Sequence, residues 1–220
     1  MGHTITSTGI TGDQITEFDY AQTTNLMIIT HPDFNPKQIS RTGLAITTFA
    51  IADVDFAHVP AYDFTERVYN SYTFTLSDNT IGKGRTLTSS TAIFTDEYIG
   101  GVFYAAGTTV DEPLGFARIT AVGGGAPDTT ATVDIVSEFS STIKSPGTEN
   151  GSDCVLAMKA WSDLESDGSG NRGWPSCVTF YQNRLFFAGS KDLPQSMWGS
   201  KNGDFGNFEA GTGQDDDAFG

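Results

Sequence analysis

Apolar and polar positions alternate with a period of two along several short stretches, and the clearest of them lies between residues 177 and 208. Val178 and Phe180 fall on one face of an extended strand, and Leu185 and Phe187 fall on one face of the next. No window carries a sustained period of 3.6 residues with capping residues. The pattern therefore predicts strands rather than helices.

Turn residues separate these strands. Gln182-Asn183 is a plausible two-residue turn because Asn tolerates positive φ, and Asn202-Gly203 is a strong turn signal. Trp198 lies on a third strand that follows a Pro-containing loop. The stretch predicts an antiparallel meander that buries aromatic side chains on at least one side.

A second stretch, from Phe18 to Gly43, has a similar pattern. Leu26-Met27-Ile28 corresponds to Leu185-Phe186-Phe187, and Ile39 corresponds to Met197 at a nearly equal sequence separation. Pro32 to Pro36 predicts a turn. An internal structural repeat explains this correspondence, and chance similarity between two hairpins is the alternative.

Between the two stretches, residues 64–146 hold evenly spaced short strands with glycine turns, as expected for a small β-barrel or sandwich inserted into a loop of a host fold. The predicted organisation is a first propeller-like part at 1–63, the inserted domain at 64–146 and a second propeller-like part at 147–220. A blade takes about 40 residues, so the host parts make roughly three blades, and a closed ring needs about four to eight. We expect a mainly β protein with partial β-propeller-like meanders that continue beyond the chain end; an open sandwich is the alternative.

Composition and charge narrow the function classes. The chain has 25 Gly, 16 Phe and a net charge of −15. The acidic balance argues against an ordinary nucleic-acid-binding surface and against anionic membranes. No apolar run approaches the ~20 residues that span a bilayer, so no membrane anchor is expected. Cys154 and Cys177 are predicted to be free buried thiols, with a disulfide as the alternative.

The region around the first stretch, residues 173–208, resembles a known family. Gly173-Trp174-Pro175, Arg184 to Ser190 and Trp198 to Phe208 look like the tail tubular protein B, or nozzle, of short-tailed bacteriophages. The resemblance is specific around 173–208 and loose over the rest of about 17–215. Its signature and packing residues are Trp174, Arg184, Phe187, Trp198, Asp204 and Phe208.

The resemblance implies a non-enzymatic structural protein of the virion tail, made in the host bacterial cytoplasm. It implies a ring-shaped homo-oligomer, a hexamer, in contact with other tail proteins. DNA passes through this ring during ejection without specific binding. It implies no catalytic residues and no cofactor.

Candidate chemistry in the sequence is sparse. Asp163, Glu165 and Asp167 resemble the start of a calcium loop, but the closing bidentate Glu would fall at Trp174, and a solvated acidic loop is the stronger interpretation. Asp215-Asp216-Asp217 is interpreted as a solvated charge run. No nucleophile elbow, phosphate loop or zinc motif is present. No catalytic, cofactor-binding or metal residue is therefore assigned.

Aromatic side chains leave a second function class open. Trp161, Trp174, Trp198, Phe205 and Phe208 could stack on sugars, although aromatics in alternating strands are more often core residues. The alternative function is a cell-surface carbohydrate-binding or polysaccharide-degrading β-propeller.

Overall fold

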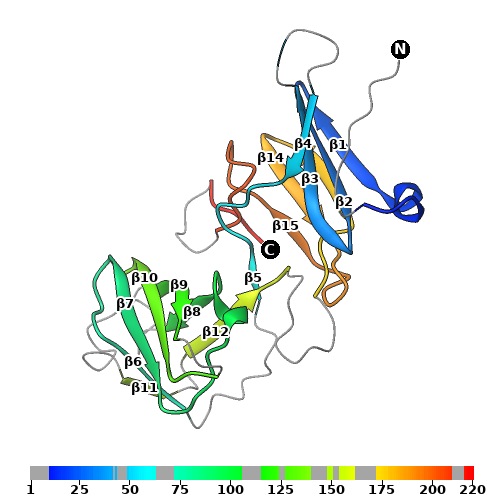
Figure 1. Ribbon diagram of the computed structural model, residues 1–220. Coiled ribbons are helices and arrows are strands. Elements are labelled where there is room, and N and C mark those ends of the chain that lie inside the picture. The colour runs from blue at the N-terminus through cyan, green and yellow to red at the C-terminus, as the bar shows by residue number, and fades with distance from the viewer. Residues whose placement is uncertain are drawn as a thin grey trace, which may run out of the picture. The chain divides into compact units, whose positions relative to one another are not determined.

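The protein is mainly β, with antiparallel sheets and only short 3-10 helices (Figure 1). The computed structural model describes residues 10–41, 43, 49–62, 72–105, 115–123, 127–139, 148–150, 154–161, 172–209 and 216–220. The chain divides into two compact units, which are described separately. The first unit combines residues 1–60 with 161–220, and the second comprises residues 61–160.

The first unit begins with a 3-10 helix and a four-stranded antiparallel sheet in the order β1-β2-β3-β4, drawn from blue to cyan in Figure 1. Neighbouring strands along the chain pair with each other, so the sheet is a simple meander. The elements are η1 (Asp13–Glu17), β1 (Asp19–Thr23), β2 (Leu26–His31), β3 (Phe34–Arg41) and β4 (Phe49–Asp53).

The predicted turn from Pro32 to Pro36 is shorter than expected. Only Pro32 and Asp33 form it, and Pro36 lies inside β3. The register between β2 and β3 shifts between Ile29 and His31, so the proline, which has no N–H to donate, sits opposite an irregularity in the ladder. On its other side, the carbonyl of Pro36 accepts a hydrogen bond from the N–H of Val54 at 2.8 Å.

A three-stranded antiparallel sheet, in the order β13-β14-β15, completes the regular structure of the first unit. The predicted turn is confirmed, since Gln182 and Asn183 both have positive φ between paired strands. The predicted alternation is confirmed as well, with Leu185 and Phe187 buried on one face. The strands are β13 (Cys177–Tyr181), β14 (Arg184–Ala188) and β15 (Met197–Gly199).

The two hairpins, β1–β2 and β13–β14, both close with a two-residue turn. They differ in the burial that follows it. Ile28 is buried three residues after Asn25, whereas Phe187 is buried four residues after Asn183. The sequence comparison aligns Ile28 with Phe187. In that alignment the two turns, which end at Asn25 and Asn183, are displaced from each other by one residue.

An aromatic cluster forms the core beneath β13–β15. Trp161 is fully buried, and its ring centroid lies 5.1 Å from that of Trp198, 5.2 Å from Phe208 and 5.3 Å from Phe187. Phe56 joins from the earlier part of the chain, 5.6 Å from Trp161. Because Phe56 and Trp161 lie on either side of residues 61–160 in the sequence, both chain segments of the first unit build one core.

The second unit is an antiparallel sheet of eight strands in the order β11-β6-β7-β10-β9-β8-β12-β5. Its outermost strands, β11 and β5, do not pair with each other, so the predicted barrel does not close in the part of the chain that the structure describes. The elements are β5 (Ala61–Tyr62), β6 (Thr73–Leu76), β7 (Gly82–Ser89), η3 (Asp96–Tyr98), β8 (Val102–Ala105), β9 (Gly115–Val122), β10 (Thr130–Ser137), β11 (Thr148–Asn150) and β12 (Cys154–Lys159).

This unit reaches beyond the predicted insertion at 64–146. The strand at Cys154–Lys159, expected in the part after the insertion, pairs with β8 and with β5 of the second unit. The burial of Leu156 in the apolar core of that sheet accounts for this pairing. Cys154 is a free buried thiol as predicted, but Cys177 is exposed, since it lies on the outward side of β13.

Candidate functional site: the outer face of the four-stranded sheet

One face of the β1–β4 sheet is lined by apolar side chains. Residues directly opposite each other in antiparallel strands share a face, and faces alternate along each strand. Met27 pairs with Gln22 and Ile39, and Ile39 pairs with Ile51. We call this side the outer face; its residues are Tyr20, Gln22, Met27, Ile29, Lys37, Ile39, Arg41, Phe49, Ile51 and Asp53.

The opposite face of the same sheet packs against the rest of the first unit. Ile28 is 1 % exposed, and Thr30 donates a hydrogen bond to the carbonyl of Ser176 at 3.2 Å. The Asp19 carboxylate accepts the backbone N–H of Val178 at 2.8 Å. The start of β13 therefore covers the inner face over β1 and β2, while Ala50 and Ala52 on the same face of β4 are exposed. A part-buried carboxylate–amide hydrogen bond holds the two sheets together.

The outer face is uncovered by comparison. Tyr20 is 64 % exposed and Phe49 is 41 % exposed, while Met27, Ile29 and Ile39 are half-buried. Contiguous exposed apolar surface on a folded domain marks an interaction site more often than isolated apolar residues do. The outer face is thus the strongest candidate for function in the first unit.

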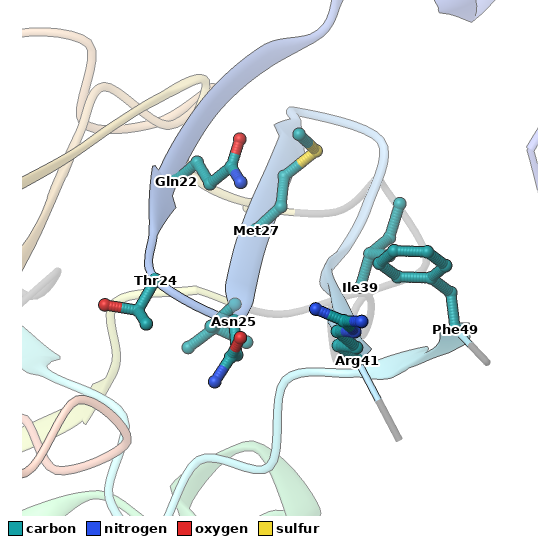
Figure 2. A pocket seen from close by; sticks show the side chains of 8 residues that line it. Gln22, Thr24, Asn25, Met27, Ile39, Arg41 and Phe49 are labelled. Carbon is teal, nitrogen blue, oxygen red and sulfur yellow. The ribbon is translucent and has the colours of Figure 1, made fainter. Parts of the chain in front are cut away.

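A hollow of about 270 Å³ lies at one end of the outer face, next to the β1–β2 turn (Figure 2). Gln22 and Met27 reach it from neighbouring strands, and the ring of Phe49 lies beside Ile39. Thr24, Asn25, Leu26 and Arg41 complete its lining.

Two side-chain amides in the hollow are available to a partner. The side-chain amides of Gln22 and Asn25 make no hydrogen bond with any residue that the structure describes. Arg41 donates from Nε to the carbonyl of Gly43 at 2.8 Å, and its side chain is exposed. The two amides, the guanidinium of Arg41 and the ring of Phe49 together suit a polar ligand that has one apolar face, or a peptide segment.

At the other end of the sheet, His31 and Asp33 form a network of hydrogen bonds with neighbouring residues. The buried His31 accepts the backbone N–H of Asp33 at Nδ1, 3.2 Å away, so Nε2 carries the proton that faces Glu17 Oε2 at 3.0 Å. Lys191 Nζ lies 2.7 Å from Asp33 Oδ1, and this hydrogen bond holds the pKa of Asp33 below its ordinary value. His31 therefore serves local structure.

The predicted signature residues lie elsewhere in the first unit. Trp174, Phe187, Trp198 and Phe208 are buried, as the core interpretation of the aromatics predicts. Arg184 donates from Nη1 to two backbone carbonyls, and Asp204 is exposed beside the Asn202-Gly203 turn. The structure brings the aromatic members together in the core and places Asp204 at the surface.

The candidate calcium residues Asp163, Glu165 and Asp167 lie outside the described residues. Within the described ranges, no group of three or more His, Cys, Asp or Glu side chains is arranged to hold a metal ion. In the same part of the chain, no helix is long and apolar enough to cross a membrane.

No protein-family model matches the chain, and a search of curated proteins finds no match. The outer face was not singled out from the sequence. A signal for it existed, because Leu26 to Ile29 is apolar at every position and so predicts apolar side chains on both faces of β2.

Proposed function

We propose that this chain is a structural component of a bacteriophage tail, a nozzle or tubular protein that forms part of the DNA-ejection conduit. In this proposal, the two sheets of the first unit are blades of a partial propeller, and the second unit is a small barrel-like domain inserted between them. The protein works by assembly rather than by catalysis, resides in the virion tail and is made in the host bacterial cytoplasm.

The observation that carries the proposal is the apolar outer face. A four-stranded meander that packs one face against a second sheet over β1 and β2 and leaves the other face uncovered has the form of a blade whose neighbour is missing. A ring of six copies, the number that the family resemblance implies, and contacts with other tail proteins would cover such faces. The resemblance around residues 173–208 supports the choice of a phage nozzle among ring-forming proteins.

The net charge of −15 fits a conduit for DNA. Carboxylates that line a channel repel phosphates, so DNA slides past without the counterion release that produces tight binding. Replacing acidic residues that face the channel with Lys should slow DNA ejection in a virion assay, whereas replacements on the outside of the ring should leave ejection unchanged.

Negative-stain imaging of the purified chain is the direct test. Rings of several copies support the proposal, and particles of single copies at all concentrations argue against it. A matched variant, Ile39→Glu on the outer face, should abolish the rings, whereas Ile81→Glu, an exposed apolar position in the second unit, should leave them intact.

A cell-surface carbohydrate-binding or polysaccharide-degrading protein is the second candidate, and the hollow favours it. Unpaired amides of Gln22 and Asn25 beside the ring of Phe49 resemble the polar and aromatic contacts that hold sugars. Binding on a glycan array that is lost in Phe49→Ala and Asn25→Ala, with no ring in images, would favour this candidate over the tail protein.

A further inference from the structure

The three-stranded sheet of the first unit has a further segment along its β15 edge. Gly199 and Phe219 exchange backbone hydrogen bonds, with N–O distances of 2.8 and 3.1 Å. The N–H of Asn202 also donates to the carbonyl of Asp216 at 3.1 Å. We call residues 216–220 the edge segment; Figure 1 draws it in red beside β15. It occupies the place that β4 has in the four-stranded sheet.

The edge segment places a small–aromatic–small sequence, Ala218-Phe219-Gly220, along β15, and we call the surface that it covers the groove along β15. The ring of Phe219 packs edge-on against Phe186, with centroids 5.6 Å apart. Gly199 makes room for that ring, because a Cβ at this position would lie 2.6 Å from it. Gly220 lies against Trp198, where a Cβ would come within 2.2 Å of the indole. Ala218, which precedes these two residues in the segment, is buried.

Arg184 fixes the edge segment from the neighbouring strand. Its Nη1 donates to the carbonyls of Ser200 and Asp217, both at 2.6 Å. The guanidinium carbon also lies 5.9 Å from the centroid of the Phe219 ring. Charge-assisted hydrogen bonds to backbone and a cation–π contact recognise an extended segment that carries an aromatic residue. The groove therefore suits an extended segment that carries an aromatic side chain.

The edge segment is held by fewer backbone hydrogen bonds along the sheet than β4. It shares an isolated bridge with Gly199 and one further backbone hydrogen bond with Asn202, and Phe219 remains 45 % exposed. By contrast, β4 pairs with β3 over its full length from Phe49 to Asp53. Segments with few hydrogen bonds and partly exposed side chains open at lower free energy than fully paired strands. The groove should therefore empty without unfolding of the sheet.

We propose that the groove along β15 is a strand-accepting site, and that the edge segment of a second copy of this chain enters it. The same copy's segment already fits the groove, so an identical segment from another copy makes the same contacts. Exchange of an identical element between copies needs no new interface, and addition of a strand to an open sheet edge is a common mode of peptide binding. This proposal does not depend on the phage-tail assignment.

The first test uses a fluorescent peptide with the sequence of residues 214–220 and the full chain carrying Phe219→Ala. This variant keeps the chain intact while weakening its own edge segment. The peptide should bind it one to one and should bind the wild-type chain at least about tenfold more weakly, which corresponds to about 1.4 kcal/mol. A peptide with Phe219→Ala is the control ligand and should bind about tenfold more weakly than the parent peptide.

Gly199→Val in the same variant fills the space for the ring and should abolish binding, while circular dichroism and the exchange of β13 and β14 amides stay unchanged. Failure of the peptide to bind the Phe219→Ala chain, or equal binding of the two peptides, would overturn the strand-accepting site.

The second test detects exchange between copies. Isotopically heavy and light chains, each with photoreactive benzoyl-phenylalanine in place of Phe219, are mixed and irradiated. Cross-links from position 219 of one isotope to β14 or β15 of the other should form and should increase with concentration. Cross-links confined to one isotope at every concentration would overturn exchange between copies, even if the peptide binds.

Discussion

The eight-stranded sheet of the second unit buries its apolar side chains against its own strands, whereas the four-stranded sheet of the first unit leaves them on its outer face. Phe74, Leu87, Phe103 and Ile119 in the second unit are almost completely buried. Among the described residues, the large exposed apolar side chains lie mostly in the first unit: Ile15, Tyr20, Phe49, Tyr181, Met197 and Phe219, against Tyr62 and Ile81 in the second.

This difference indicates that stability and association depend on different residues of the protein. A sheet that buries its own apolar residues needs no partner, and the second unit has this character. The first unit has a packed aromatic core and an unpacked apolar face in one structure, so part of its apolar surface is available for association. Substitutions in the core and on the outer face should therefore affect different measurements.

Phe187→Ala should have the largest effect on stability. It removes a ring from the centre of the aromatic cluster and should lower the free energy of unfolding by about 3–5 kcal/mol. Chemical denaturation followed by Trp fluorescence would measure this loss, because all three Trp residues belong to the first unit. Phe103→Ala is the matched substitution in the second unit. If it shifts the Trp transition as strongly as Phe187→Ala does, the two units do not have separate cores.

Asp19→Ala should have the next largest effect. It leaves the buried N–H of Val178 without its acceptor, which should lower the free energy of unfolding by about 1–3 kcal/mol. Asp19→Asn retains an acceptor oxygen and should lose less. Asp53→Ala serves as the control, since that carboxylate pairs with Lys37 on the exposed side of the sheet and should contribute less than about 1 kcal/mol. Equal losses for Asp19→Ala and Asp53→Ala would contradict the role given to Asp19.

Phe49→Ser on the outer face should leave the free energy of unfolding within about 1 kcal/mol of the wild type, because Phe49 is 41 % exposed. Its expected effect is on association, measured as molar mass by light scattering. Tyr62→Ser, at a similarly exposed position in the second unit, should change neither quantity. Loss of stability in Phe49→Ser without any change of mass would show that the outer face serves folding alone.

Lys191→Met should have the smallest effect, and that effect should depend on pH. Lys191 lowers the pKa of Asp33, so the pair stabilises the fold above the ordinary pKa of Asp and loses this contribution as the pH falls through the lowered pKa. The difference between wild type and variant should be present at neutral pH and should vanish once the pH is below the lowered pKa of Asp33. Asp33 is exposed, so the difference is small. A difference that grows on acidification would contradict this assignment.

Local patterns predicted much of the fold. The β13–β14 turn follows from Gln182-Asn183, and the buried positions Leu185 and Phe187 follow from strict alternation. Pairing between distant segments was harder to predict. The strand at Cys154–Lys159 joins β8 because of long-range packing, and neither its length nor its flanking residues indicate this partner.

The outer face, too, could not be predicted from local patterns alone. The apolar run from Leu26 to Ile29 indicates a strand that is buried on both faces, but which face is covered depends on where β13 lies. The hollow also combines Gln22, Arg41 and Phe49 from three strands, and their meeting depends on sheet register. Register is set by the whole sheet and cannot be read from any single strand.

The central claim is that the outer face associates with other copies of the chain. Sedimentation velocity of the wild-type chain and of the Ile39→Glu variant, from micromolar to sub-millimolar concentration, tests it most directly. We expect the wild type to sediment as an assembly of several copies and the variant to sediment as a single folded copy. A wild-type chain that remains a single copy over this whole range, or a variant that assembles equally well, would contradict the claim.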